Sequence, residues 1–163
     1  MSQQEQERLT EKDFALFLGA KMRCQQKGHQ YKDFIIDFKN IEYFVNSPFA
    51  KSYEVKPILR PLSDIKEQEL IDIAKVIYGN PDSVKWRVEF NKYRNCHLVY
   101  RKHYNKRFTY CCETGEIECY DMDGVDECKD IYMNQHHVTK YLISKHLDVF
   151  GWIEKGLALD STK

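Results

Sequence analysis

Hydrophobic residues recur at helical spacing in three stretches of the chain. A short helix is expected to begin at Thr10, because Asp13 stands where a capping box places its acid, and to end near Gly19. A second helix is expected after Asp64, and a longer third helix extends from Asn134 to about residue 150. The second helix carries an apolar stripe formed by Leu70, Ile73, Ala74 and Ile77.

Between residues 84 and 120 the apolar positions change to a period of two, which is typical of strands with one buried face. We interpret this stretch as three or four antiparallel strands. Tight turns that join them are expected at residues 93–95, 103–105 and 114–115, with a further turn at 121–124. Earlier in the chain we expect strands at residues 20–24 and 34–38, an irregular segment at 41–50, and an extended segment at 53–62.

These elements predict an α+β fold: a mostly antiparallel sheet with a short N-terminal helix, a middle helix and a longer C-terminal helix packed on it. No repeat or Gly/Ser-rich linker marks a boundary, so we expect a single domain over residues 1–163, frayed at 1–9 and 160–163. The C-terminal helix and the turn after it offer the longest apolar surface. We therefore expect burial of Tyr141, Leu142, Leu147, Phe150 and Trp152.

The composition does not change the predicted fold, but it excludes several classes of function. The 163 residues include 25 lysines and arginines and 25 aspartates and glutamates, so the formal net charge is zero. Global attraction to DNA or to an anionic membrane is therefore not expected to drive function. The polar N-terminus does not resemble a signal peptide, and the longest apolar run, residues 14–18, is far below the roughly twenty residues of a membrane span. We expect a cytoplasmic protein without a membrane partner, whose six cysteines are thiols.

Charge is divided unevenly along the predicted sheet. Residues 85–107 hold eight lysines and arginines and only one acid, Glu89, whereas residues 113–130 hold eight acids and only Lys129. If the two stretches pair as neighbouring strands, the charges compensate and the role is structural. If they do not, the basic stretch is suited to single-stranded nucleic acid, with cations on phosphates and rings on bases. The residues of that candidate interface are Lys92, Arg94, Arg101, Lys102, Lys106 and Arg107, with Tyr100 and Tyr104 for stacking.

Two groups of residues are candidate metal ligands. Thiols and imidazoles suggest zinc, but six residues separate Cys112 from Cys119 and eight separate Cys119 from Cys128, unlike the paired ligands of a structural site. The acidic run at 121–127 lacks the twelve-residue pattern of an EF-hand. We therefore expect no metal and no other cofactor. The thiols and imidazoles considered are Cys96, His97, Cys111, Cys112, Cys119, Cys128, His136 and His137.

No common catalytic signature is present: the chain has no GxSxG, Walker, GxGxxG or HExxH motif. Enzymatic activity is therefore not indicated, and no catalytic residue is assigned. One enzymatic alternative stays open, a metal-dependent nuclease that uses carboxylates between residues 113 and 126. The carboxylates considered for it are Glu113, Glu116, Glu118, Asp121, Asp123 and Asp126.

Two motifs carry a resemblance. KPILRPLSD (residues 56–64) and YLISKHLDVFGWIEKGLALD (residues 141–160) resemble a family of uncharacterised proteins encoded by bacteriophages, prophages and other mobile elements of gut bacteria, and FALFLGAKMRC (residues 14–24) is similar to the opening of those proteins. The resemblance supplies no activity. It implies an accessory protein of the bacterial host cytoplasm that binds a macromolecule, with a host or phage protein as the favoured partner and nucleic acid as the alternative.

Overall fold

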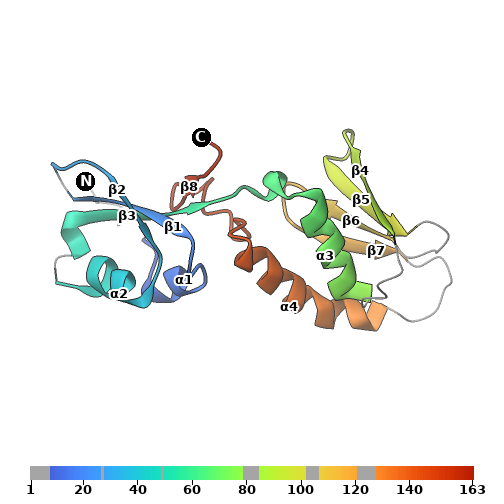
Figure 1. The fold of residues 1–163 in the computed structure, drawn as a ribbon, viewed down its shortest axis with the longest axis horizontal. Coiled ribbons are helices and arrows are strands. Elements are labelled where there is room, and N and C mark those ends of the chain that lie inside the picture. Colours follow the sequence, from blue (N-terminus) through green and yellow to red (C-terminus); the bar gives the residue numbers. More distant parts are fainter. Residues whose placement is uncertain (1–7, 27, 49, 79–84, 102–106, 121–127) are drawn as a thin grey trace, which may run out of the picture. The chain divides into compact units, whose positions relative to one another are not determined.

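The structure is a computed structural model that describes residues 8–26, 28–48, 50–78, 85–101, 107–120 and 128–163. The chain divides into two compact units (Figure 1). The first unit comprises Met1–Pro61 and Phe150–Lys163, and the second comprises Leu62–Val149. The strands that the structure describes form two four-stranded sheets, one in each unit, where the sequence predicted one sheet. The single domain over residues 1–163 stays a prediction, since two compact units can belong to one domain.

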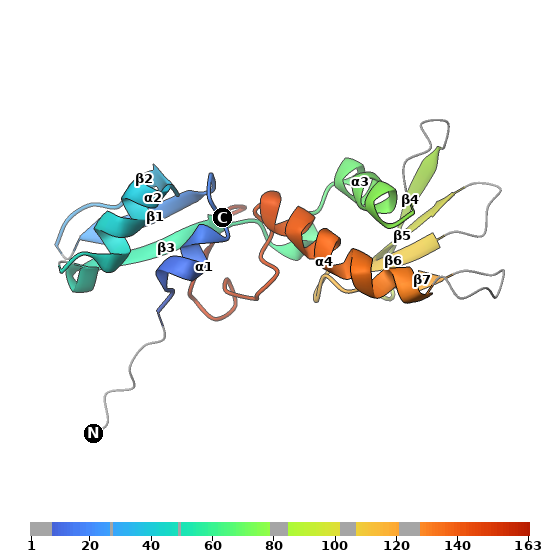
Figure 2. The same cartoon turned by 90° about the horizontal axis from the view of Figure 1, so that it is seen from below.

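The first unit contains a mixed sheet with the strand order β2-β1-β3-β8. β1 pairs antiparallel with β2 and β3, and β3 pairs parallel with β8. The short helices α1 and α2 lie on one side of this sheet (Figures 1 and 2). The elements are α1 (Glu11–Ala15), β1 (Lys21–Gln26), β2 (Lys32–Ile35), α2 (Phe38–Ile41), a π-helical turn (Glu42–Asn46), a 3₁₀ turn (Ala50–Ser52), β3 (Tyr53–Leu59) and β8 (Leu159–Asp160).

Two parts of the first unit differ from the prediction. The strand expected at 34–38 ends at Ile35, and helical turns replace the irregular segment expected after residue 41. The cause is Asp37, whose Oδ1 accepts a hydrogen bond of 2.7 Å from the backbone amide of Asn40 and so caps α2. The capping box at Thr10 is confirmed, because the Thr10 amide donates to Asp13 Oδ2 at 2.6 Å.

The core of the first unit joins both ends of the chain. The Phe17 ring lies 5.3 Å from the Trp152 ring, and Trp152 is buried as expected. Phe150, also expected to be buried, is 38% exposed, although it stacks on Trp152 at 5.1 Å. Residues 160–163 were expected to fray, yet the amide of Ser161 donates to Leu59 O at 2.8 Å and extends the pairing of β8.

The second unit has an antiparallel sheet in the order β4-β5-β6-β7, with α3 and α4 on one side of it (Figures 1 and 2). The helices close over Val99, Phe108 and Tyr110, all of which are fully buried. The α+β class is thus confirmed. The predicted turns at 93–95 and 114–115 are present, whereas those at 103–105 and 121–124 lie outside the described residues. The elements are a 3₁₀ turn (Leu62–Asp64), α3 (Glu67–Tyr78), β4 (Trp86–Asn91), β5 (Cys96–Arg101), β6 (Arg107–Cys111), β7 (Ile117–Tyr120) and α4 (Cys128–Ser144).

Both helices of the second unit begin elsewhere than predicted. Asp64 lies in the 3₁₀ turn, and the amide of Lys66 is instead satisfied by Glu69 Oε2 at 2.9 Å, so α3 starts at Glu67. α4 starts at Cys128 and continues through Asn134, the expected cap. An asparagine inside a helix costs less than about 1 kcal/mol, so a good cap residue does not force a helix to begin there. Within the described residues, no helix is long and apolar enough to span a membrane.

Candidate functional site

The two faces of the β4-β5-β6-β7 sheet differ in what covers them. Strand register places Val88, Val99 and Phe108 on the face that packs against α3 and α4. The alternate residues point to the opposite side. We call this side the open face, since the described helices of the unit lie on the other one. Its described residues are Arg87, Glu89, Asn91, Cys96, Leu98, Tyr100, Arg107, Thr109, Cys111 and Glu118.

A groove of about 660 Å³ runs from this open face to the β4–β5 turn. Lys92 and Arg94 are exposed on the turn, and the Tyr93 ring between them is entirely exposed. Arg107 lines the groove from β6 and is also exposed. Three cations therefore share the groove with one carboxylate. The groove is lined by Glu89, Phe90, Asn91, Lys92, Tyr93, Arg94, Cys96, Leu98, Arg107 and Thr109.

The carboxylate of the groove is already engaged within the sheet. The Tyr100 hydroxyl donates a hydrogen bond to Glu89 Oε1 from the neighbouring strand. This bond, and then burial, raise the pKa of Tyr100, while Arg87 acts in the opposite direction. The Tyr100 hydroxyl is thus held between Glu89 and Arg87, and Glu89 already accepts a hydrogen bond before any partner arrives.

The β4–β5 turn is preorganised by its own side chain. Asn91 Oδ1 accepts hydrogen bonds from the backbone amides of Tyr93 at 3.0 Å and Arg94 at 3.3 Å. Asn95, at the end of the turn, adopts a left-handed φ of 45° and donates from Nδ2 to Glu113 Oε1 at 3.0 Å. Asparagine tolerates both roles, which explains its presence at the two ends of this turn. The exposed side chains of the turn are therefore presented by a fixed backbone.

The structure brings together only part of the interface that the sequence predicted. Lys92, Arg94 and Arg107 line one groove, and Tyr100 lies beside it on the open face. Arg101 belongs to the other face, because its register partner Trp86 packs against the helical core. Arg101 was therefore wrongly grouped with the others: alternation along a strand separates it from Tyr100. Lys102, Tyr104 and Lys106 lie outside the described residues.

The acidic stretch does join the sheet beside the end of the basic one, since β6 begins at Arg107 and β7 carries Glu118. β7 is the neighbour of β6, and Glu118 stands opposite Thr109 on the open face. Glu116 and Glu118 are both exposed. The open face thus changes sign across its width, from Lys92, Arg94 and Arg107 near the groove to Glu118 on β7 and Glu116 just before that strand. The two stretches are thus neighbours in the sheet, but the register sets Glu118 opposite Thr109 rather than opposite a cation.

No group of three or more His, Cys, Asp or Glu side chains within the described residues is placed to hold a metal ion. Cys112 lies in the helical core, where burial raises the pKa of its thiol, and Cys119 packs against that core. His136 and His137 are exposed on α4. Of the nuclease carboxylates, Glu113, Glu116 and Glu118 are exposed, and Asp121, Asp123 and Asp126 lie outside the described residues, as does the Cys128 side chain.

Sequence reasoning missed two side chains of the groove. Alternation along the strand puts Phe90 on the same face as Trp86 and Val88, and the register agrees, yet Phe90 is 50% exposed, because it lies on the edge strand β4 near the end of the sheet. Leu98 lies on the open face and is only half-buried. A signal for Leu98 was available in the Asn-Lys-Tyr-Arg-Asn turn, which fixes the register of the hairpin and hence which face each residue takes.

Comparison of the chain with protein-family models, curated proteins and solved structures found no match in any of the three. The function must therefore be inferred from the groove and from the charges around it.

Proposed function

We propose that this chain is an accessory protein of a bacteriophage or other mobile element and that it binds a macromolecule through the groove on the open face. The favoured partner is a host or phage protein. The observation that supports this proposal is the groove itself, which is lined by the cations Lys92, Arg94 and Arg107 and by the exposed aromatic residues Phe90 and Tyr93. The mobile-element origin is supported by the resemblance of residues 56–64 and 141–160.

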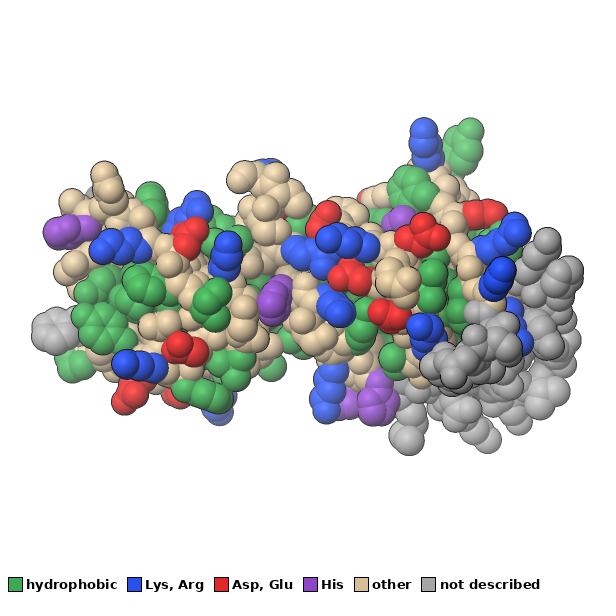
Figure 3. Space-filling model, in the orientation of Figure 1, with side chains coloured by type: hydrophobic (Ala, Val, Ile, Leu, Met, Phe, Trp, Pro, Cys, Tyr) green, Lys and Arg blue, Asp and Glu red, His purple; other side chains and the backbone are tan. Residues whose placement is uncertain are grey.

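A polypeptide suits the charges better than a uniform polyanion does. A protein segment can place acidic side chains against Lys92 and Arg94 and basic ones against Glu116 and Glu118. A strand of phosphates that lies across the same face would meet those carboxylates with repulsion. Exposed rings such as Tyr93 are the residues that commonly anchor protein interfaces. The remaining exposed side of this unit, over α3 and α4, also mixes both signs (Figure 3).

Single-stranded nucleic acid is the second candidate, and one observation favours it. Lys92 and Arg94 flank the fully exposed Tyr93, so cations for phosphate contacts and a ring for base stacking stand side by side on one rigid turn. For the nuclease alternative the described residues supply no comparable observation.

Site-specific photocrosslinking in bacterial cells tests the protein-partner proposal. A photoreactive amino acid at Lys92 or Thr109 reports on the groove, and one at Lys140, exposed on α4, is the matched control. We expect the same protein adduct from both groove positions and not from Lys140. The partner, identified by mass spectrometry and purified, should bind the wild-type chain, and Arg94→Glu should weaken that binding about tenfold or more. Different adducts at the two groove positions, or the same adduct from Lys140, would contradict the proposal.

Gel-shift titrations with single- and double-stranded DNA and RNA test the second candidate. Micromolar binding that falls steeply with salt, and that is abolished by Arg94→Glu and Arg107→Glu, would replace the protein partner with nucleic acid. Arg101→Glu is the matched control, because it makes the same charge change on the other face of the same sheet.

A further inference from the structure

Two cysteines stand directly opposite each other on adjacent strands of the second unit: Cys96 of β5 faces Cys111 of β6. The backbone of Cys111 is turned away from β5, because its amide donates to Glu116 O and its carbonyl accepts from Gly115, each at 2.9 Å. The next bond between the two strands runs from the amide of Cys112 to Asn95 O at 3.1 Å. Cys96 and Cys111 therefore form a non-hydrogen-bonded pair.

This type of pair brings side chains closest together in an antiparallel sheet. Its Cα atoms are typically about 4.5 Å apart. Disulfides need a Cα separation of roughly 4.4–6.8 Å. Both side chains also point to the same face, because register partners in an antiparallel ladder share a face. The backbone of β5 and β6 can accept a disulfide here without a change of register.

The two thiols differ in reactivity. Hydrogen bonds from the Thr114 hydroxyl and from the amides of Thr114 and Glu113 lower the pKa of Cys111, and they outweigh the opposing effects of burial and of the Glu113 charge. Cys111 is partly exposed, whereas Cys96 is 7% exposed. Cys112 is adjacent in sequence but lies in the helical core, and burial raises the pKa of its thiol. Cys111 is thus suited to attack an oxidant, and Cys96 is suited to attack the oxidised sulfur of Cys111 and so form the disulfide.

We propose that Cys96 and Cys111 are a redox pair that closes to a cross-strand disulfide when the reduced protein meets a hydroperoxide. With hydrogen peroxide, the Cys111 thiolate attacks one oxygen, an S–O bond forms as the O–O bond breaks, and the leaving hydroxide takes a proton to become water. The Cys96 thiolate then attacks the sulfur of the Cys111 sulfenic acid. The S–S bond forms as the S–O bond breaks, and the second hydroxide leaves as water after protonation. Two thiols and one peroxide thus become one disulfide and two waters.

The pair lies where its oxidation would alter the proposed binding surface. Cys96 lines the groove, and Cys111 ends the strand that carries Arg107 and Thr109. A covalent bridge between β5 and β6 would fix the sheet at the end nearest the β4–β5 turn. The bridge is reversible by a dithiol through thiol–disulfide exchange. Disulfide formation requires only the reduced chain and a peroxide, so it can be tested without the binding partner, and its outcome does not depend on the proposed function.

Peptide mapping tests the pair directly. The reduced full-length protein is treated with hydrogen peroxide, its remaining thiols are alkylated, and it is cleaved without reductant after arginine and glutamate. Cleavage after Arg94 and Arg101 isolates Cys96, and cleavage after Arg107 and Glu113 isolates Cys111 together with Cys112. We expect these two peptides to be joined, and to separate after treatment with a dithiol. The same joined peptides from Cys112→Ser would assign the bond to Cys111.

Single substitutions test the order of the steps. Cys96→Ser should stop at a sulfenic acid on Cys111 that is trapped by dimedone, and Cys111→Ser should give neither the adduct nor the joined peptides. Thr114→Val, which removes a hydroxyl that lowers the pKa of Cys111, should shift the pH midpoint of Cys111 alkylation upward. Circular dichroism of each variant shows that it is folded. Free alkylation of both Cys96 and Cys111 after peroxide, or joined peptides that disappear in Cys112→Ser, would overturn the proposal.

Discussion

The two sheets of this protein are assembled from the chain in opposite ways. In the second unit, β4 to β7 follow one another in sequence and pair in that same order. In the first unit, β3 pairs with β8, so its sheet combines strands from opposite ends of the chain. Contacts between neighbours in sequence close with a small loss of chain entropy, whereas contacts between the chain ends close a long loop. The second sheet is therefore built from pairs of strands that are neighbours in sequence, whereas the first also needs a pair of strands from opposite ends of the chain.

The difference also appears in the side chains that close each core. The second unit is filled by aliphatic and aromatic side chains of its own sheet and helices, such as Val99, Phe108 and Leu142. The first unit depends on Phe17 meeting Trp152 and Phe150 from the other end of the chain. Removing one chain end should therefore affect the two units very differently.

Truncation after Val149 is expected to give the largest effect. It removes Trp152 and β8, and the loss of a buried tryptophan alone costs about 3–5 kcal/mol, a large part of the stability of a small unit. Hydrogen exchange followed by mass spectrometry should show protection lost in β1 and β3 and kept in β5 and β6. Removal of only Thr162 and Lys163 is the control. Unchanged protection in β1 and β3 would refute the dependence of the first sheet on both chain ends.

In the second unit, Leu142→Ala on α4 is expected to destabilise the protein by about 2–5 kcal/mol. Leu142 is 3% exposed and packs in the core beneath α3 and α4, so its truncation leaves a cavity. Urea unfolding measures the change. Lys140→Ala, exposed on the same helix, should stay within about 0.5 kcal/mol of the wild type. Equal midpoints for Leu142→Ala and the wild type would show that α4 does not cover the sheet.

The same contrast explains which elements the sequence could predict. The period-two pattern and its turns gave the strands of the second sheet because each strand pairs with its neighbour in sequence, and the register then follows from the hairpin turn. β8 was missed, because two residues that pair with a strand at the other end of the chain leave no local pattern. Helix starts were wrong at Asp64 and Asn134, since the preference of a residue for a cap is weaker than tertiary packing. The start at Asp37 was overlooked, although its side chain does cap α2.

The candidate site, like the fold, was only partly predictable from the sequence. The cations of the β4–β5 turn could be grouped from the sequence because they are adjacent on one hairpin. Arg101 was misplaced because its neighbour Tyr100 points to the other face, and the assignment of faces needs the register. The pairing of Cys96 with Cys111 depends on the register in the same way and has no local signal.

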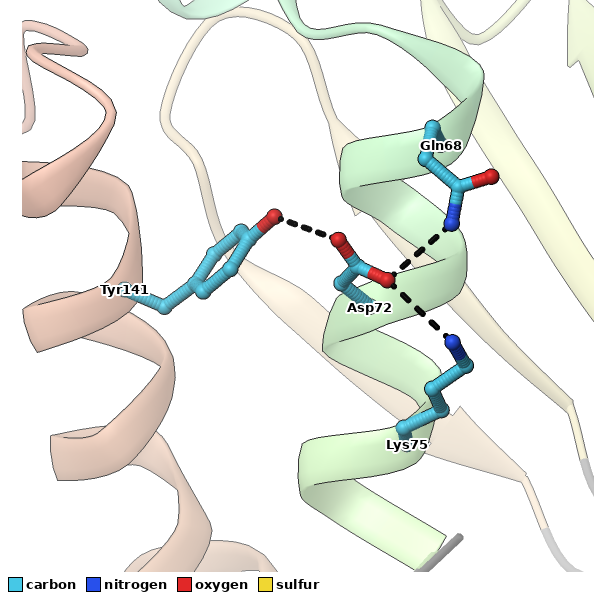
Figure 4. A network of polar contacts seen from close by, with 4 residues as sticks. All are labelled: Gln68, Asp72, Lys75 and Tyr141. Carbon is cyan, nitrogen blue, oxygen red and sulfur yellow. Dashed lines mark hydrogen bonds and ion pairs between the residues drawn. The ribbon is translucent and has the colours of Figure 1, made fainter. Parts of the chain in front are cut away.

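Tyr141→Phe should give a smaller change than Leu142→Ala. The Tyr141 hydroxyl on α4 donates to Asp72 Oδ2 on α3 at 3.1 Å, and Gln68 and Lys75 contact the other carboxylate oxygen (Figure 4). Loss of one such hydrogen bond costs about 0.5–1.5 kcal/mol. Urea unfolding at neutral pH measures this cost. An effect as large as that of Leu142→Ala would mean that the hydroxyl does more than join the two helices.

The hydrogen bond from Tyr141 to Asp72 should also affect how stability changes with pH in acid. Burial alone would raise the pKa of Asp72, but hydrogen bonds from Gln68, Tyr141 and Lys75 and the charge of Lys75 bring it below its ordinary value. The stabilisation from Asp72 is therefore present above the pKa of an unfolded aspartate and is lost as pH falls through the lowered pKa. Tyr141→Phe should move this loss to higher pH in acid unfolding. Acid transitions at the same pH in both proteins would contradict this role.

The smallest effect is expected at the surface of the first unit, from Asp33→Asn. Arg23 Nε and Nη2 contact the two oxygens of Asp33 at 2.8 and 3.2 Å, and this pairing lowers the pKa of Asp33. Both side chains are more than 40% exposed, so water and salt screen the pair. The change in unfolding midpoint should be smaller than that of Tyr141→Phe and should vanish near 1 M salt, where the Debye length is about 3 Å. A larger change that persists in high salt would show that β1 and β2 depend on this ion pair, and that local contacts also hold the first sheet together.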